Sequence, residues 1–303
     1  MNISTLNDPY LGSSKNSRPI PDAEIIEFIN KQIDPKYLYD GGSIQSDFIN
    51  KYFNWIQASK LNSLPGLEKF NALDFVHGTS QAFDFFYLNH HGRRFRCFKS
   101  DFAYHKVSWK LNMNWKFLEE DDLREGDALV LSIPFSDYGG LHPMTDSLIQ
   151  RCNELNIPVL IDAAYYGMAR DINFNVDQPC IDTITFSLSK VFYGADKLRI
   201  GIRCRKVHAD DGCLLFNQYQ QVSKLAVAVG LKLIENFETD HTQNKFREKQ
   251  LEVCKELNIE PSNCITFGLA TKDHPEFGGN DRGSEWRRVC ISKQLSNCYN
   301  DEN

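Results

Sequence analysis

The stretch "TFSLSKVFYGADKLRIG", Thr185 to Gly201, decides the fold that we expect for this chain. It begins as an apolar run typical of a buried strand, and Lys190 follows where that strand ends. An ammonium there is penalised unless its pKa falls, and a lysine so placed can act as an amine nucleophile. The alternative is that Lys190 extends to solvent and that Arg199 pairs with a surface acid.

The serines and the arginine of this stretch indicate a binding site only when they are considered together. Ser187, Ser189 and Arg199 offer hydroxyl and guanidinium groups, which are suited to binding a phosphate. For any one of these residues a surface role is the better interpretation. Taken together with Lys190, and in this chain order, they favour a binding site.

The segments around this stretch predict alternating strands and helices. Nearly continuous apolar runs at 127–135, 157–167, 182–190 and 198–206 indicate strands buried on both faces. An amphipathic helix is predicted at 144–156, and longer helical segments lie before residue 55 and after residue 217. This order predicts an α/β fold with a mostly parallel central sheet flanked by helices and a small α/β C-terminal part.

The composition of the chain argues against several classes of protein. The 303 residues are 42% hydrophobic and carry a formal charge of −6, which is ordinary for a soluble globular chain and argues against nucleic-acid binding. The short basic run "HHGRRFR", His90 to Arg96, is interpreted as a solvated loop or strand edge. Nine cysteines without a Cys-x-x-Cys spacing predict reduced thiols and no metal site. With no apolar run long enough to span a membrane, a cytoplasmic protein is expected.

Two further candidates lie where predicted strands end, at the edge where α/β sheets bind ligands. Gly78, Thr79 and Ser80 form a small-residue turn before a helix, which offers backbone N–H groups to a phosphate or is simply an N-cap. Asp162 closes a buried strand, where a carboxylate is costly unless a cation or a hydrogen bond meets it. Tyr165 follows three residues later, close to Asp162.

These residues together resemble the fold-type I pyridoxal-phosphate (PLP) enzymes, most closely the class I/II aminotransferases and their histidinol-phosphate aminotransferase-like branch. The similar motifs are "IDAAYYGMA", "SLSK" followed by "LRIG", "HGTSQAFD", "LNDPYLGSS" (Leu6 to Ser14) and "RRVCIS". The resemblance spans nearly the whole chain, and the Asp and Lys motifs are its specific parts. It implies a segment 1–45 at the small domain and dimer interface, a PLP-binding domain 46–215, and C-terminal helices with a reduced small domain, 216–303.

The resemblance also assigns roles to the central residues. Lys190 would hold the cofactor as a Schiff base and later move a proton, and Asp162 would keep the pyridine nitrogen protonated. Tyr165 would bind the 3-oxygen of the ring. The phosphate would be held by the donors of three segments: Gly78, Thr79, Ser80, Ser187, Ser189 and Arg199.

Four more residues take roles from the resemblance. Phe102, with Tyr104 as the alternative, would stack on the pyridine ring, although both would serve equally as core residues. Arg288 would bind the substrate carboxylate, with Arg287 on the other face of the strand. Tyr39 would reach the phosphate of a partner subunit, which implies a homodimer with shared active sites.

Three departures from the family pattern affect the site. The family has an asparagine beside the 3-oxygen where this chain has Ser136 or Asp137, and an aspartate there would raise the pKa of the Schiff base. Lys190 and Arg199 are one residue further apart than is usual. The chain is also shorter than most family members, which makes carboxylate recognition less certain than cofactor binding.

The predicted function is a PLP-dependent aminotransferase that acts on an amino acid or related amine and a 2-oxo acid. The same site supports decarboxylation, elimination or oxidase chemistry, because the cofactor stabilises whichever carbanion forms. The substitution of the family's asparagine gives weight to that alternative. A non-catalytic binding module is the least favoured hypothesis, because Lys190, Asp162 and Arg199 are all present.

Overall fold

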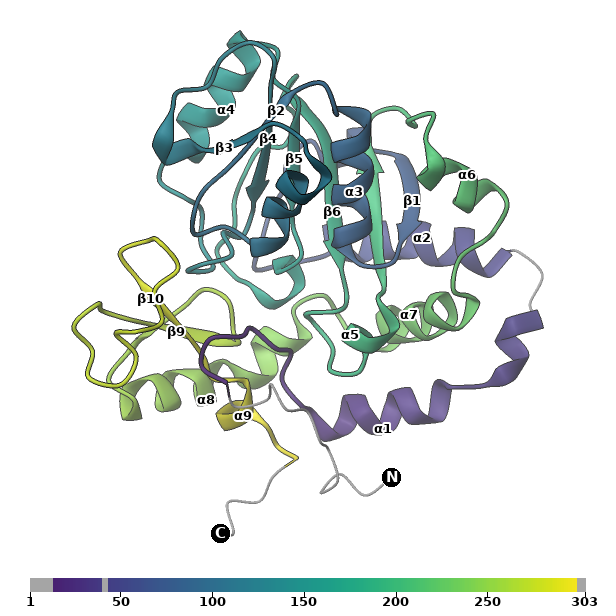
Figure 1. Cartoon of the computed structure of the whole chain (residues 1–303). Coiled ribbons are helices and arrows are strands. Elements are labelled where there is room, and N and C mark those ends of the chain that lie inside the picture. Colours follow the sequence, from purple (N-terminus) through teal and green to yellow (C-terminus); the bar gives the residue numbers. More distant parts are fainter. Residues whose placement is uncertain (1–12, 40–42, 299–303) are drawn as a thin grey trace.

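The computed structural model describes residues 13–39 and 43–298, and its centre is a seven-stranded sheet (Figure 1). The strands lie in the order β1 (Ala72–Val76), β7 (Gly201–Arg205), β6 (Ile181–Ser187), β5 (Val159–Asp162), β4 (Asp127–Ser132), β2 (Arg94–Cys97) and β3 (Trp115–Phe117). Neighbouring strands are parallel except at β7, which runs antiparallel to both β1 and β6. The predicted α/β class with a mostly parallel sheet is confirmed, while the reversed direction of β7 was not foreseen.

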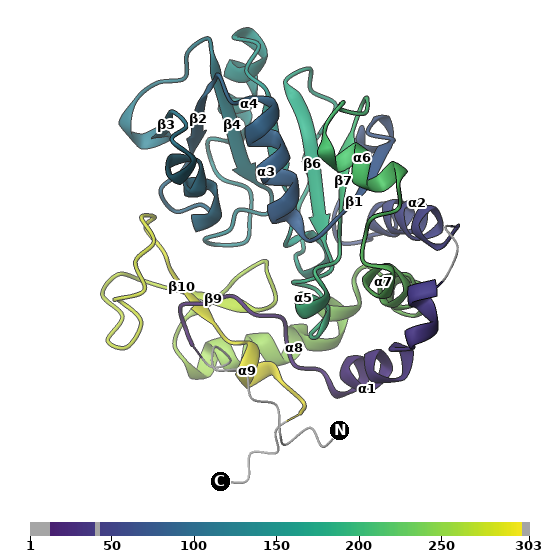
Figure 2. The same cartoon turned by 45° about the vertical axis from the view of Figure 1, so that its right-hand side comes forward.

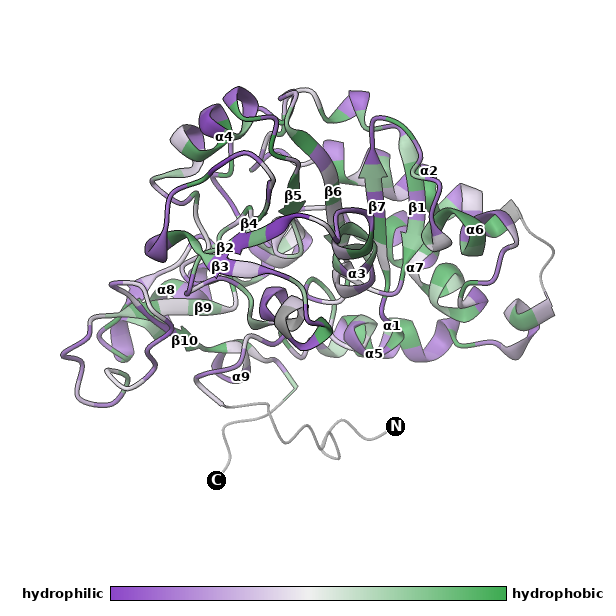
Figure 3. Ribbon diagram, turned by 45° about the horizontal axis from the view of Figure 1, so that its top comes forward, coloured by the Kyte–Doolittle hydropathy of each residue, from purple (hydrophilic) through white to green (hydrophobic). Residues whose placement is uncertain are grey.

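The central strands are apolar on both sides because helices cover both faces of the sheet. In β4, Ala128 and Val130 pack with the aromatic residues of α3 (Thr79–Asn89), whereas Leu129 and Leu131 belong to the cluster on the opposite face. The helices that contribute to that second cluster include α2 (Ser43–Gln57), α4 (Thr145–Glu154) and α7 (Lys224–Asn236). Figure 3 shows hydrophobic residues concentrated in β5 and β6. A continuous apolar run is what a strand between two helical layers requires.

Shorter elements connect these layers. They are the α-helices α5 (Ala195–Leu198) and α6 (Gly212–Gln218) and the 3₁₀ turns η2 (Pro35–Tyr39), η3 (Leu67–Lys69), η4 (Ala103–Leu111), η5 (Leu118–Glu120) and η6 (Tyr166–Met168). Within residues 13–39 and 43–298, every helix is too short or too polar to cross a bilayer.

A smaller part lies below the central sheet in Figure 2. It contains α8 (His241–Glu256), α9 (Ser292–Leu295) and an antiparallel sheet in the order β10 (Arg287–Cys290), β9 (Phe267–Ala270) and β8 (Glu260–Pro261). The N-terminal segment runs beside β10, where the Cys290 N–H donates to the Ser14 carbonyl at 2.9 Å. The expected small α/β part is therefore present, and it is built from both ends of the described chain.

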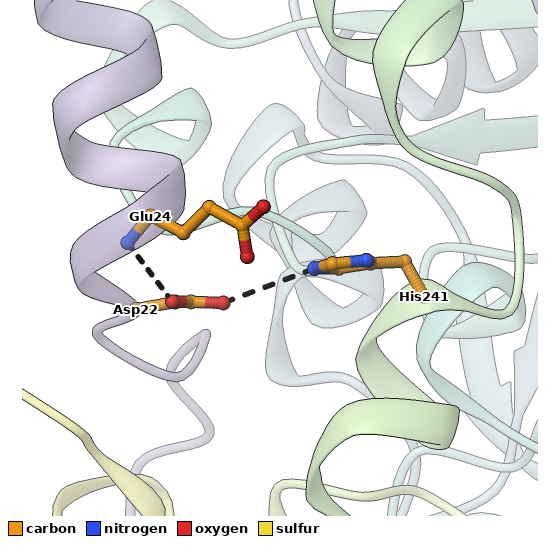
Figure 4. Close-up of side chains that lie close together, drawn as sticks. All are labelled: Asp22, Glu24 and His241. Carbon is orange, nitrogen blue, oxygen red and sulfur yellow. Dashed lines mark hydrogen bonds and ion pairs between the residues drawn. The ribbon is translucent and has the colours of Figure 1, made fainter.

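A cluster of charged side chains joins α1 (Ala23–Gln32) to α8 (Figure 4). Asp22 caps α1 by accepting from the Glu24 N–H at 3.1 Å, and its carboxylate lies 3.9 Å from His241 Nε2. Lys245 Nζ lies 2.7 Å from both the Asp22 and the Glu24 carboxylates. Burial opposes ionisation of Asp22, but hydrogen bonds from His241, Lys245 and Asn297 outweigh it and lower its pKa to about 2. The lysine ammonium thus supplies the positive charge that this acidic pair requires.

The basic run at residues 90–96 is a solvated turn only in its first part, where His91 and Gly92 are exposed. Its second part is a buried strand rather than the loop or edge that composition suggested. Arg94 and Arg96 lie in β2, between β3 and β4, and are 6% and 1% exposed. Asp127, at the start of β4, accepts from Arg94 Nε at 2.7 Å and from Arg96 Nη1 at 2.8 Å. The arginines are buried because a carboxylate and several backbone carbonyls satisfy their donors.

We expect Asp127→Ala to lower the free energy of unfolding by about 3–5 kcal/mol, because it leaves two buried guanidinium groups without their shared carboxylate. Urea unfolding followed by circular dichroism measures the change. The control is Glu154→Ala, which removes an exposed ion pair with Arg151 and should leave the unfolding midpoint nearly unchanged. Equal small effects of the two variants would contradict this account.

Candidate functional site

Lys190 lies in a turn at the carboxyl end of β6. The strand itself ends at Ser187, three residues earlier than the sequence indicated, because the Ser187 hydroxyl accepts from the Ser189 N–H and turns the chain. The half-buried Lys190 side chain donates to the Ser17 carbonyl at 3.1 Å. Its Nζ also lies 5.9 Å from the centre of the Tyr165 ring. The amine is therefore held at the sheet edge between the N-terminal segment and the loop after β5.

An anion-binding corner forms where β1, α3 and the β6–β7 connection meet. Gly78 precedes α3 with φ +72°, and a Cβ at this position would lie 2.5 Å from Arg199 Nη2. Glycine is therefore needed both for the backbone conformation and for the close approach of the guanidinium. Arg199 Nη2 donates to the Ser80 hydroxyl at 3.1 Å. A guanidinium beside the first N–H groups of an 11-residue helix is suited to a phosphate.

Asp162 is the last residue of β5 and is 4% exposed. The Ala164 N–H donates to its carboxylate at 3.1 Å. Burial is the largest influence on this group, and the nearby Asp101 carboxylate adds to it. The Ala164 N–H, Lys190 and the Thr79 hydroxyl offset these influences in part, and the pKa of Asp162 rises to about 7. A cationic group beside this carboxylate would stabilise its ionised form.

Asp101 and His105 belong to the same buried cluster and were not identified from the sequence. His105 Nε2 lies 3.9 Å from the Asp162 carboxylate and 4.0 Å from that of Asp101, and within the described residues it has no hydrogen-bond partner. Its Nδ1 is 3.1 Å from the Tyr87 hydroxyl. Burial lowers the pKa of His105 to about 4, although Asp101 acts against this. Asp101 did carry a signal, because it follows the end of β2 much as Asp162 ends β5.

Ser136 and Asp137, the two candidates for the position of the family's asparagine, face different parts of the structure. The Ser136 side chain lines the same cavity as Asp162 and Lys190, and its hydroxyl donates to Asp101 at 3.1 Å. Asp137 is wholly buried and turns instead toward the loop before β10, where it accepts from the Ser284 hydroxyl and pairs with Arg282 Nε at 2.9 Å. Of the two alternatives, the serine therefore faces the cavity.

Two adjoining cavities bring most of the predicted residues together. The first, of about 130 Å³, is lined by Thr79, Ser80, Phe102, Ser136, Asp162, Ala164, Tyr165, Ser187, Ser189, Lys190 and Arg199. The second, of about 380 Å³, shares Phe102, Tyr165 and Lys190 with the first and adds Asn16, Ser17, Arg18, Ala103, Arg282 and Arg288. Lys190 and Tyr165 thus lie at the boundary between the two cavities.

The remaining predicted residues divide into those at the cavities and those away from them. Phe102 lines both cavities, whereas the Tyr104 hydroxyl donates to Asp84 and its side chain lines neither. Arg288 is 4% exposed and lines the larger cavity, while Arg287 points away and pairs with Asp281.

Two predicted features lie outside the cavities. The Tyr39 side chain is 86% exposed and lines neither cavity. The turn after it, 40–42, and most of the motif at 6–14 lie outside the described residues. The role predicted for Tyr39 toward a partner subunit therefore stays a prediction.

Comparison with known proteins identifies the fold. No family model and no curated protein matches the sequence. Solved structures do match. An aminotransferase from Staphylococcus aureus is similar with a TM-score of 0.61 at 12% identity, over 97% of this chain and 95% of that one. The L-threonine-O-3-phosphate decarboxylase from Porphyromonas gingivalis is similar with a TM-score of 0.62 at 14% identity, over 93% and 96%.

A third match has a different reaction. The PLP-bound C-S lyase from Staphylococcus hominis is similar with a TM-score of 0.63 at 12% identity, over 96% of this chain and 87% of that one. This chain therefore has the fold of the fold-type I PLP enzymes over most of its length, as expected from the sequence. At such low identity the likeness concerns the fold, and proteins that share it catalyse different reactions.

We expect Asp162→Asn to stabilise the unliganded protein more at pH 8 than at pH 5. The folded state holds the Asp162 proton up to about pH 7, whereas the unfolded state loses it near pH 3.8. Asp162 therefore costs increasing stability as the pH rises from about 4 to 7, and asparagine removes this cost. The gain should be on the order of 2 kcal/mol larger at pH 8.

Urea unfolding of both proteins at the two pH values measures this difference. Asp146→Asn, at an exposed position in the first turn of α4, is the control and should show the same small effect at both. A gain for Asp162→Asn that did not change with pH would refute the expectation.

Proposed function

We propose that the chain is a PLP-dependent aminotransferase that moves an amino group between an amino acid, or a related amine, and a 2-oxo acid. The observation that carries the proposal is that an amine, a buried carboxyl and an anion-binding corner line one cavity. These are Lys190, Asp162 and, from the corner beside Gly78, the residues Thr79, Ser80 and Arg199. When bound, PLP supplies an aldehyde that condenses with amines and a ring that accepts the electrons of a carbanion.

The residues present fit this cofactor. Arg199, the Ser80 hydroxyl and the N-terminus of α3 would bind the phosphate, with Ser187 and Ser189 in the same cavity wall. Asp162 would accept a hydrogen bond from the protonated pyridine nitrogen. Burial first and the Asp101 carboxylate second raise the pKa of the unliganded Asp162, and a cation at that place would offset both, which supports this role.

Three side chains would orient the ring. Phe102 would stack on it, since this aromatic residue lines both cavities. The Tyr165 and Ser136 hydroxyls would bind the 3-oxygen, with the serine in the place of the family's asparagine. Because Ser136 is neutral and Asp137 is turned away, no negative side chain from this loop would lie beside that oxygen.

The substrate would bind in the larger cavity. Arg288 would hold its carboxylate, because this guanidinium is buried and has no acidic partner within the described residues. Lys190 Nζ lies at the boundary of the two cavities, where it would move a proton between the substrate Cα and the cofactor carbon that carries the substrate nitrogen.

Another PLP reaction, such as decarboxylation or elimination, is the second candidate. Ser136 at the place of the asparagine favours it, and the structures with the same fold include a decarboxylase and a C-S lyase. A non-catalytic module is disfavoured because Lys190, Asp162 and Arg199 converge on one cavity.

We also propose that the protein is a homodimer and that it is located in the cytoplasm. A homodimer with shared sites is supported by apolar side chains exposed on η2 and α6, namely Leu38, Tyr39, Leu215 and Phe216. A cytoplasmic location fits the nine free thiols, eight of which are buried.

We expect the purified protein to take up PLP and to absorb near ~420 nm, as PLP bound to a lysine amine does, and Lys190→Ala to abolish this band. Lys197→Ala, on the exposed side of nearby α5, is the matched control and should keep it. Absorbance spectra after dialysis against PLP measure both variants. A protein that does not take up PLP would refute both enzyme hypotheses.

Single-turnover experiments separate the two reactions. Amino acids added to the PLP-loaded protein without a 2-oxo acid should convert the cofactor into its pyridoxamine form, because transamination leaves the amino group on the cofactor. The conversion is read from the loss of the ~420 nm band. Release of CO2, ammonia or peroxide without this conversion would replace the aminotransferase proposal with the second candidate.

A further inference from the structure

Several cationic side chains line the larger cavity beside Lys190. Its lining contains three arginines and one lysine: Arg18, Arg282, Arg288 and Lys190. No aspartate or glutamate is among the described residues that line it. The three arginines come from the N-terminal segment, the loop before β10 and β10 itself, so the fold brings them together from distant parts of the chain.

Arg288 accounts for one anionic group of a substrate. Its Nη atoms donate to the carbonyls of Ser136 at 2.6 Å and Lys15 at 3.2 Å. Its buried Nε has no partner among the described residues. This guanidinium matches the α-carboxylate that every α-amino acid carries.

Arg282 is a second guanidinium that an ordinary amino acid would leave unused. Its Nη2 donates to the carbonyls of Ser100 at 3.1 Å and Asp101 at 3.3 Å, and its Nε pairs with Asp137. These contacts fix the side chain against the wall of the cavity. Its Nη1 has no hydrogen bond within the described part of the chain, so this group remains available to a ligand.

Asp137 orients Arg282 but does not line the cavity. The Asp137 side chain is wholly buried, whereas that of Arg282 is 24% exposed and lines the cavity. Burial first and repulsion from Arg288 second lower the pKa of Arg282. A bound anion would relieve the repulsion from Arg288.

We propose that the substrate carries a second anionic group, a carboxylate or a phosphate ester on its side chain, and that Arg282 binds it. This inference rests on the proposed function, since it takes Arg288 to hold the α-carboxylate. A neutral side chain would displace water from Arg282 without replacing its hydrogen bonds. A site built for a polar group therefore rejects analogues that lack it.

The test compares anionic substrates with their uncharged analogues in the PLP-loaded protein. The pairs are L-glutamate with L-glutamine, L-aspartate with L-asparagine, and O-phospho-L-serine with L-serine. At least one anionic member should react at least about 10-fold faster than its partner, measured as kcat/KM of the first half-reaction. Whether the dicarboxylates or the phosphate ester react fastest identifies which anion Arg282 binds.

Substitution of Arg282 gives the decisive comparison. Arg282→Met should reduce the reaction of the preferred anionic substrate by about 10- to 100-fold and leave its neutral analogue little changed. Arg282→Lys should retain part of the preference. Arg287→Met is the matched control, because Arg287 bonds only within its own loop and does not line the cavity.

A binding measurement does not depend on turnover. Titration calorimetry of the PLP-loaded protein with succinate and with propionate should show tighter binding of the dianion, and Arg282→Met should remove this difference. Equal reaction of charged and neutral analogues in the unaltered protein, or an equal loss for both in Arg282→Met, would overturn the inference. A protein without the ~420 nm band would instead overturn the proposed function, so the two failures are distinguishable.

Discussion

The site depends on one constraint, which is a carboxylate buried at the end of a strand with another carboxylate beside it. Asp162 is 4% exposed, Asp101 is 2% exposed, and His105 faces both without a hydrogen bond from its Nε2. Such a cluster is costly in an unliganded protein, because burial disfavours the ionised form of Asp162 and the nearby Asp101 carboxylate adds to this effect. A positive group placed against Asp162 would offset part of that cost, so the cluster is better suited to a bound cation than to an empty cavity.

The order of the strands places the other groups around this carboxylate. The parallel strands β4, β5 and β6 end at the same edge, which brings Ser136, Asp162 and Lys190 together. The antiparallel β7 lies between β6 and β1, and its Gly201 is in register with both Ser187 and Val76. Arg199 is therefore delivered to the beginning of α3, close to Gly78. The anion-binding corner is a consequence of this one reversed strand.

Much of this could be predicted from the sequence because the relevant signals are local. Buried strands such as β4 are apolar without interruption, and a carboxylate or lysine directly after such a strand is conspicuous. The second half of the basic run at 90–96 misled the prediction, because composition does not show that Asp127, some thirty residues later, neutralises Arg94 and Arg96. Arg282 was missed for a similar reason, since it acts through residues that are distant in the chain.

The sequence by itself determined the α/β class, the order of the main elements and the residues Lys190, Asp162 and Arg199, because strand burial and the chemistry at strand ends depend on short stretches of chain. Only the tertiary structure decided which of two adjacent residues faces the cavity, Ser136 or Asp137. It alone placed Arg282 beside Arg288 and His105 between two carboxylates. These arrangements require the packing of segments up to more than a hundred residues apart, and no local pattern encodes such distances.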